Sequence, residues 1–327
     1  MTSRYLLSLV LALNCALESQ AEQRTAREWL DAMNGAFRDL NYDGIFSYYG
    51  GSDLTSLRIV HVVVNGVERE RLVHLNGAPR EIIRKGQSVA CILQPGDDIL
   101  ELESSIPAGP FAQAFSRRFD AVAEHYEIAA YGTGRIAGRP AVRIGVSARD
   151  EDRYGFRLWL DEGTGLLLRS ELLDTDGSQL EVFQFTHLVV GDVDVGAVES
   201  ESVDGSAVVS HLELDETPLV AQTSVPWHAA WVPRGFVMSS ADIRRNSSRK
   251  AVNTLMYTDG LAAFSIFIES MPKKGAGMME SRAGGTVVVT DTAEDRDGLD
   301  YLVTVVGEVP LMTARKVAGA IAYRTRP

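Results

Sequence analysis

Turn sequences at short, nearly regular intervals constrain the fold of this chain more than any other feature. Between residues 42 and 188, runs of β-branched and aromatic residues alternate with turns such as Asn65-Gly66, Asn76-Gly77 and Asp176-Gly177. Asn-Gly is the strongest short-range hairpin signal, because both residues accept a positive φ. The pattern predicts one large, mostly antiparallel sheet instead of alternating strands and helices. The candidate strands are Ser56–Val64, Val67–Leu75, Glu81–Lys85, Ser88–Leu93, Gly138–Val146, Tyr154–Leu160, Leu166–Leu173 and Leu180–Leu188.

Helical spacing occurs at the start of this region and in one interruption of it. The stripe near the N-terminus begins after Thr25, a candidate N-cap with Glu28 as its capping-box partner. Its apolar members are Ala26, Leu30, Met33, Phe37 and Leu40. A second stripe of aromatic residues lies between 107 and 126. We expect these helices to cover the concave face of a curved sheet, which forms either an apolar tunnel suited to acyl chains or a fully packed core.

A smaller second domain is predicted after an acidic stretch without regular period, which divides the chain into 22–198, a linker at 199–220, and 221–327. Its strand within Leu255–Ser270 follows the turn Thr258-Asp259-Gly260 and is apolar on both faces. Phe264, Ile266 and Ile268 share one face and are expected in the core. Leu261, Ala263 and Phe267 share the other, which either packs on another element or meets a partner.

Further elements of the second domain are predicted from short apolar runs. Two more strands are expected at Gly285–Asp291 and Tyr301–Val306. A closing helix is expected to start at Pro310, because proline suits the first turn of a helix. Its apolar face would consist of Leu311, Ala314, Val317 and Ile321. The expected fold class is therefore α+β, with a large antiparallel half-barrel followed by a smaller α+β domain.

The first 21 residues have the features of a secretory signal peptide. Arg4 precedes the short apolar run Tyr5–Leu13, and Ser19-Gln20-Ala21 supplies small residues at a cleavage position. The run is shorter than the roughly 20 residues that span a bilayer. After cleavage Cys91 would be the single cysteine, so we expect no internal disulfide. The formal charge of −12 argues against general binding to nucleic acid.

Residue patterns typical of catalysis or metal binding are not found in the sequence. The six histidines show no metal-ligand spacing, and no Cys-x-x-Cys motif occurs. Gly132-Thr133-Gly134 with Gly138 deviates by one residue from a dinucleotide-binding pattern. Acidic runs at 150–152 and 291–300 lack the order of a calcium-binding loop. We therefore predict a protein that is not an enzyme and has no cofactor and no metal.

Several stretches in order resemble the RseB/MucB regulators of the envelope-stress sigma factor in Gram-negative bacteria. In the large domain these stretches are residues 77–86 and the hairpin formed by Arg153–Asp161 and Leu167–Asp174. In the small domain they are Trp231–Phe236, Tyr257–Ser265, and Val306–Pro310 followed by Thr313-Ala314. The resemblance covers the whole chain after the signal peptide.

This resemblance implies a periplasmic binding protein. Its large domain would resemble lipoprotein carriers, and its small domain and interdomain groove would bind the periplasmic region of a membrane-anchored anti-sigma factor. Binding would shield that factor from regulated proteolysis, and lipid or lipopolysaccharide would loosen the complex. A lipid or lipoprotein carrier without a regulatory partner remains an alternative, as does a hydrolase whose site the sequence does not reveal.

Two sets of residues are the candidate sites under this interpretation. The candidate walls of an acyl-binding cavity are Leu30, Met33, Phe37, Tyr154, Phe156 and Leu158. The candidate contacts to the anti-sigma factor are Trp227, Trp231, Tyr257, Phe264 and Phe267, because aromatic anchors contribute a large share of binding energy. Ordinary core packing is the alternative for the first set. A homodimer is compatible with the sequence.

Overall fold

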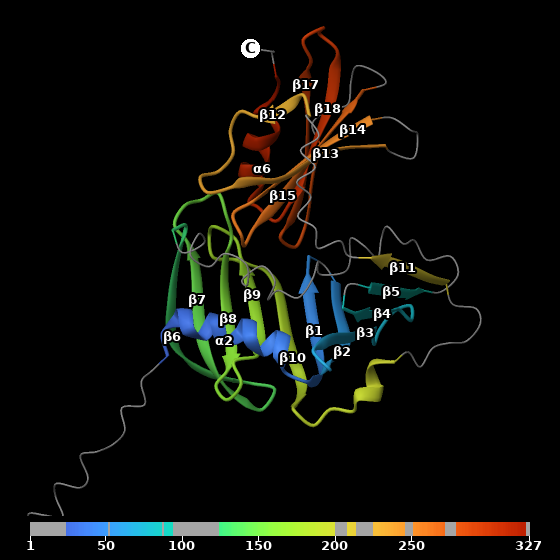
Figure 1. Ribbon diagram of the computed structural model, residues 1–327. Coiled ribbons are helices and arrows are strands. Elements are labelled where there is room, and N and C mark those ends of the chain that lie inside the picture. Colours follow the sequence, from blue (N-terminus) through green and yellow to red (C-terminus); the bar gives the residue numbers. More distant parts are fainter. Residues whose placement is uncertain are drawn as a thin grey trace, which may run out of the picture.

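The large domain is built on one open antiparallel sheet of eleven strands (Figure 1). The computed structural model describes residues 24–51, 53–86, 88–93, 124–199, 208–213, 225–245, 251–271 and 279–324. The predicted signal peptide at 1–21 lies outside these residues, as do the aromatic residues 111–119 of the predicted helical insert. The strands are β1 (Tyr42–Gly50), β2 (Asp53–Val64), β3 (Val67–His74), β4 (Glu81–Lys85), β5 (Ser88–Leu93), β6 (Tyr126–Ile136), β7 (Arg139–Ala148), β8 (Gly155–Asp161), β9 (Leu167–Leu173), β10 (Gln179–Val190) and β11 (Val208–Glu213).

Strand order in this sheet is β11-β5-β4-β3-β2-β1-β10-β9-β8-β7-β6. Neighbours along the chain pair as hairpins, which confirms the predicted antiparallel sheet. The β2–β3 turn has φ values of 53° at Asn65 and 77° at Gly66, as the Asn-Gly signal requires. Two pairings depart from chain order, because β1 pairs with β10 as well as β2, and β11 pairs with β5.

Three strands of the large sheet were not predicted from the sequence. β1 and β6 contain glycine and small residues, which weaken the strand pattern. β11 lies within 199–220, where the composition predicted a linker, and pairs with β5 at the edge of the sheet. The linker prediction therefore does not hold for Val208–Glu213.

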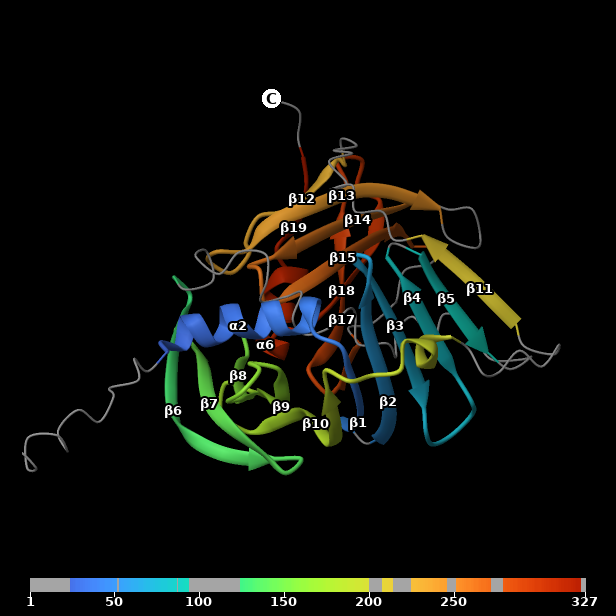
Figure 2. The ribbon, with the colours of Figure 1, turned by 60° about the horizontal axis from the view of Figure 1, so that its bottom comes forward.

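Helix α2 (Ala26–Asp39) covers the inner face of the sheet, within its curve in Figure 2. Thr25 and Glu28 form the predicted capping box, with the Glu28 carboxylate accepting from the Thr25 backbone N–H at 2.6 Å. Leu40 is the C-cap and has an extended backbone. A short 3-10 helix, η1 (Val195–Val198), packs against β2 and β3.

The small domain consists of a six-stranded sheet, a two-stranded ribbon and one helix. The sheet order is β13-β14-β15-β18-β17-β16, and the ribbon pairs β12 with β19. Helix α6 (Leu311–Ala318) begins after Pro310, as predicted. The strands are β12 (Trp227–Ala229), β13 (Val237–Arg245), β14 (Ala251–Thr258), β15 (Ala263–Ser270), β16 (Glu280–Ala283), β17 (Thr286–Glu294), β18 (Asp300–Gly307) and β19 (Ile321–Tyr323).

The core of the small domain lies between its sheet and α6. Phe264, Ile266 and Ile268 are at most 2% exposed and belong to this core, which confirms the predicted inner face of β15. Ala314 and Val317 pack on it from α6. The prediction that Ile321 extends the face of that helix is wrong, because α6 ends at Ala318 and Ile321 lies on β19.

Candidate functional site

The six predicted wall residues of an acyl-binding cavity come together in the structure. Five of them are buried in a single hydrophobic cluster of the large domain, and Phe37 packs against it. Leu30 and Met33 come from α2, and Leu158 comes from β8; all three have no exposed surface. In this conformation the side chains fill the space between helix and sheet. The residues gather as predicted, and a cavity for an acyl chain stays a prediction.

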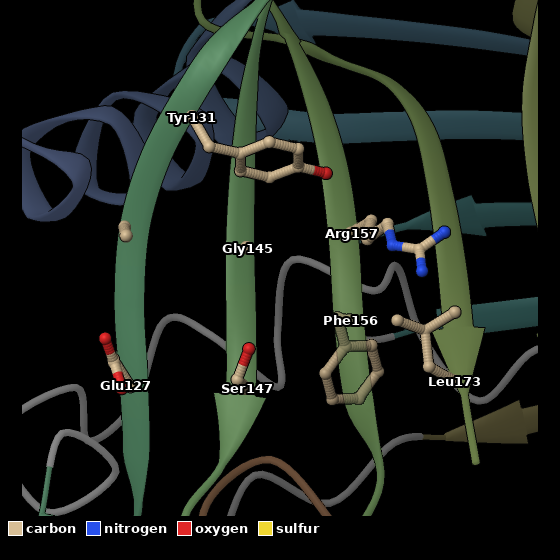
Figure 3. A pocket seen from close by; sticks show the side chains of 8 residues that line it. Glu127, Tyr131, Gly145, Ser147, Phe156, Arg157 and Leu173 are labelled. Carbon is tan, nitrogen blue, oxygen red and sulfur yellow. The ribbon is translucent and has the colours of Figure 1, made fainter. Parts of the chain in front are cut away.

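A pocket of about 280 Å³ lies on the other face of the same strands. Tyr131, Gly145, Ser147 and Arg157 line it, and in Figure 3 α2 lies behind the strands that carry these labelled residues. The Arg143 guanidinium lies 5.1 Å from the centre of the Tyr131 ring. Phe156 is the one predicted wall residue that also lines this pocket, and the other five do not.

Three of the five predicted partner contacts are core residues of the small domain. Trp227 is 1% exposed, Phe264 2% and Tyr257 8%. Their rings pack on one another and on neighbouring aromatic rings, with Tyr257 stacked on Phe264 at 5.4 Å. In this conformation they cannot contact a partner directly, so the prediction fails for them as surface residues. Their large aromatic rings fill the core of the small domain.

Trp231 and Phe267 are partly exposed and remain candidates for partner contact. Phe267 lies on the face of the small sheet opposite α6, between Thr254 and Thr304 on the neighbouring strands. Met256, two residues from Thr254 on the same face, is 38% exposed. Trp231 lies near the domain junction, where the Lys316 ammonium is 5.4 Å from its ring centre.

A buried ion pair joins the two domains at the turn that precedes β15. Arg153 of the large domain donates to Asp259 of the small domain at 2.5 Å, and neither side chain has exposed surface. The Tyr126 hydroxyl donates to the same carboxylate at 3.2 Å. Arg153 also donates to the Arg234 backbone carbonyl and to Asp150. The pair is thus fully bonded within protein, as a buried charge requires.

Burial and charge act in opposite directions on these groups. Burial alone would lower the pKa of Arg153, but the carboxylates of Asp150 and Asp259 raise it above its ordinary value. Burial raises the pKa of Tyr126, and the Asp259 carboxylate raises it further. The arginine therefore stays charged and the tyrosine stays a neutral donor at physiological pH.

The turn between β16 and β17 forms a second junction with the large domain. The Gly285 backbone N–H donates to Glu181 at 2.6 Å, and the Glu181 carboxylate also accepts from the Tyr48 hydroxyl at 2.8 Å. Gly284 leaves no room for a side chain here, because a Cβ would lie 2.4 Å from the Glu181 carboxylate. Arg282 donates to Asp174 at 2.7 Å.

Tyr154 links the hydrophobic cluster to the small domain. Its ring belongs to the cluster, and its hydroxyl donates to the Val309 carbonyl at 2.8 Å. Arg282 donates to the same hydroxyl at 3.0 Å. A third junction places Thr313 and Lys316 of α6 against Asp152. The large and small domains are therefore in direct contact at several places.

Residues of the junction were missed as functional candidates by the sequence reasoning. Arg153, Glu181 and Leu261 were not assigned a role between domains, and Leu261 is packed in the large-domain cluster. The available signal was the turn Thr258-Asp259-Gly260, whose aspartate was read as turn chemistry alone. Nothing in the pattern showed that its second carboxylate oxygen reaches another domain.

Two classes of site were also searched for in the parts of the chain that the structure describes. Within these residues no three histidine, cysteine or acidic side chains gather as metal ligands. No helix in the described ranges has both the length and the apolar character needed to cross a membrane. What the described geometry offers is packing and hydrogen bonding, both of which suit binding.

Family models match both domains. Residues 25–212 match the MucB/RseB N-terminal domain, and residues 221–322 match the MucB/RseB C-terminal domain. The chain is 37% identical to the sigma factor AlgU regulatory protein MucB of Pseudomonas aeruginosa over 321 residues, which is 96% of each chain. It is 27% identical to the sigma-E factor regulatory protein RseB of Escherichia coli K12, covering 90% of this chain and 89% of RseB.

Solved structures give the same result for the fold. A crystal structure of MucB in complex with MucA(peri) matches with a TM-score of 0.76 and 34% identity, covering 92% of this chain and all of that one. A crystal structure of MucB matches with a TM-score of 0.62 and 32% identity, covering 91% of this chain and 98% of that one. The similarity thus extends over both domains and their arrangement.

Proposed function

This chain belongs to the MucB/RseB family, and from that premise we propose that it regulates an envelope-stress sigma factor by binding the periplasmic region of a membrane-anchored anti-sigma factor. The observation that carries this proposal is the similarity of both domains, in sequence and in structure, to MucB as it occurs in complex with MucA(peri). The structure is more similar to that complex than to the crystal structure described as MucB.

The proposed site of action is the periplasm. The secretory signal predicted at residues 1–21 and the periplasmic partner of the relative both support it. Bound there, the protein shields the anti-sigma factor from regulated proteolysis, so the sigma factor stays captive. It acts by binding and has no catalytic activity of its own.

Lipid or lipopolysaccharide is the proposed signal that releases the anti-sigma factor. The proposed acyl site is the hydrophobic cluster between α2 and β8, which includes Leu30, Met33 and Phe156. Five of the six residues expected to bind lipid belong to this cluster, and the sixth, Phe37, packs against it. A branched or straight acyl chain would replace side-chain contacts there with contacts of equal polarity.

The proposed contacts to the anti-sigma factor are Phe267 and Trp231. Both rings are partly exposed, and both lie on elements of the small domain. The buried Trp227, Tyr257 and Phe264 support them indirectly by shaping the core beneath the sheet. Aromatic side chains at partly open positions provide contact area with little loss of conformational freedom.

Calorimetry with purified components tests the regulator. The chain without residues 1–21 is titrated with the periplasmic domain of its membrane anti-sigma factor, with and without lipid A. We expect binding without lipid and weaker binding with lipid. In a separate digestion, a site-specific protease should cleave the bound anti-sigma factor more slowly than the free one. Binding of lipid without any binding of the anti-sigma factor would favour the alternative, a lipid or lipoprotein carrier. Sedimentation of the same sample measures whether it forms a homodimer.

Phe267→Ala tests the proposed contact surface within that experiment. We expect affinity for the anti-sigma domain to fall by about 2 kcal/mol, as for an aromatic anchor. Val67→Ala is the control, because Val67 is 42% exposed on β3 of the large domain and belongs to neither proposed contact. Equal affinity of both variants would remove Phe267 from the surface.

A further inference from the structure

Among the residues that the structure describes, one side chain of the small domain lies in the hydrophobic cluster of the large domain. Leu261 is 8% exposed and belongs to the same cluster as Leu30, Met33, Phe156 and Leu158. All other buried members of this cluster come from residues 29–172. The turn between β14 and β15 therefore inserts a leucine from one domain into the core of the other.

Polar bonds fix the position of this leucine. One carboxylate oxygen of Asp259 accepts from the backbone N–H groups of Leu261 and Ala262, at 2.9 and 2.8 Å. Its other oxygen accepts from Arg153 and Tyr126 of the large domain. Gly260, with φ of 103°, permits the tight turn between them. The same carboxylate thus shapes the turn and ties it to the large domain.

The cluster that Leu261 enters is also the proposed acyl site. Its members are close-packed and nearly without exposed surface, so an acyl chain enters only where a side chain leaves. The large-domain members are anchored on α2 or on the sheet itself. Leu261 is attached to a separate sheet and can leave together with its domain.

We propose that Leu261 is a plug that competes with acyl chains, so that entry of lipid undocks the small domain from the large one. This inference rests on the proposed function and adds the step that connects lipid to partner. An acyl chain in the cluster expels Leu261, which pulls Asp259 away from Arg153. The Tyr154 hydroxyl, whose ring lies in the same cluster, then loses the Val309 carbonyl. Partner binding to the docked arrangement opposes lipid entry by the same factor, because the coupling is reciprocal.

Leu261→Ala tests the plug with a dansyl-labelled undecanoic acid as acyl probe. Its fluorescence is titrated against the chain without residues 1–21. We expect affinity for the probe to rise about tenfold, because burial of a leucine side chain is worth at least that factor. Lipid A should also release the anti-sigma domain at about tenfold lower concentration. Leu261→Met, which keeps the apolar volume, should remain within about threefold of the unaltered protein.

Leu299→Ala is the matched control. Leu299 lies in the turn between β17 and β18 of the same domain and is 59% exposed, so its truncation should leave probe affinity unchanged. Leu261→Ala could bind the probe no better than Leu299→Ala while lipid A still releases the anti-sigma domain from both variants. That result would contradict the role of Leu261 as a plug and would leave the proposed regulatory function unaffected. If the unaltered protein and Leu261→Ala both fail to bind the probe, the acyl site itself is wrong and the plug falls with it.

Discussion

The two domains complete their cores in different ways. The small domain covers its sheet with its own helix, and all buried residues of its core lie between Val225 and Ile321. The large domain covers its sheet with α2, and in addition takes up Leu261 from the small domain. One core is therefore self-contained, and the other includes a residue that belongs elsewhere.

This difference indicates which domain depends on the contact. Removing the large domain would expose the Leu261 turn and leave the small core intact. Removing the small domain would leave a gap in the large core and would remove the Asp259 partner of Arg153. Four substitutions test this asymmetry.

Asp259→Asn should have the largest effect. The amide keeps the shape of the turn but removes the buried carboxylate partner of Arg153, which leaves its charge paired only with the partly exposed Asp150. Breaking a buried ion pair typically lowers the free energy of unfolding by about 3–5 kcal/mol. Urea unfolding measures the loss. Asp39→Asn is the control, because Asp39 pairs with Arg38 at the surface and both side chains are about two-thirds exposed. We expect less than about 1 kcal/mol there.

The double variant Arg153→Met with Asp259→Asn sharpens the same comparison. Removing the arginine charge together with its carboxylate partner should restore part of the stability. A buried charge that loses its partner destabilises the fold by more than the intact ion pair stabilises it. Equal loss in the single and double variants would show that the turn, not the charge, holds the domains together.

Gly284→Ala should have the next largest effect. At φ of 57° a side chain is strained, and its Cβ would also lie 2.4 Å from the Glu181 carboxylate. We expect a loss of about 2–3 kcal/mol in urea unfolding, of which about 1 is backbone strain. Gly298→Ala is matched, because Gly298 has φ of 74° and no atom within 4 Å of its Cβ position. Gly284→Ala should lose more stability than Gly298→Ala. Equal losses would mean that the second junction accommodates the added methyl group without strain.

Asp161→Asn addresses the large domain alone and predicts a pH dependence. Burial would raise the pKa of Asp161, but hydrogen bonds from Arg139 and Thr164 hold it below its ordinary value. A lowered carboxyl pKa stabilises the fold above the unfolded value near 3.9 and loses that contribution as pH falls through the folded pKa. We expect a loss of about 1–2 kcal/mol at pH 7 that shrinks towards zero in acid. A loss that is independent of pH would contradict this cause.

Lys316→Ala should have the smallest effect. Lys316 pairs with Asp152 at 3.4 Å and lies over the Trp231 ring, and its side chain is 56% exposed. We expect less than about 1 kcal/mol in unfolding and a shift in tryptophan emission, because the cation leaves the ring face. An effect as large as that of Asp259→Asn would place the main domain contact at α6.

Hairpins and the inner faces of the elements could be predicted from the sequence, because local chemistry determines them. Asn65-Gly66 predicted the turn between β2 and β3, and Thr25 with Glu28 predicted the start of α2. The alternation of Phe264, Ile266 and Ile268 predicted the buried face of β15. The gathering of Leu30, Met33 and Leu158 also followed, since each lies on the apolar face of its element.

Residues at the domain contact could not be predicted in the same way. The apolar second face of the Leu255–Ser270 segment was recognised, but period alone does not tell whether Leu261 meets its own helix or another domain. Trp227 and Tyr257 were taken as surface anchors, because aromatic residues serve interfaces and cores alike. β11 was missed because an edge strand in an acidic stretch has little apolar pattern.

The position of β1 in the middle of the large sheet affects how the chain folds. β1 pairs with β10, whose residues come more than 130 positions later in the sequence, at Tyr48 and Phe183 for example. Strands β1–β5 therefore form a hairpin series in which β1 gains its second neighbour only when residues 179–190 have arrived. Distant pairings of this kind slow folding, since a long loop must close before the contact forms. A chain that crosses a membrane unfolded would thus present the unpaired edge of β1 until residues 179–190, more than halfway along the sequence, had emerged.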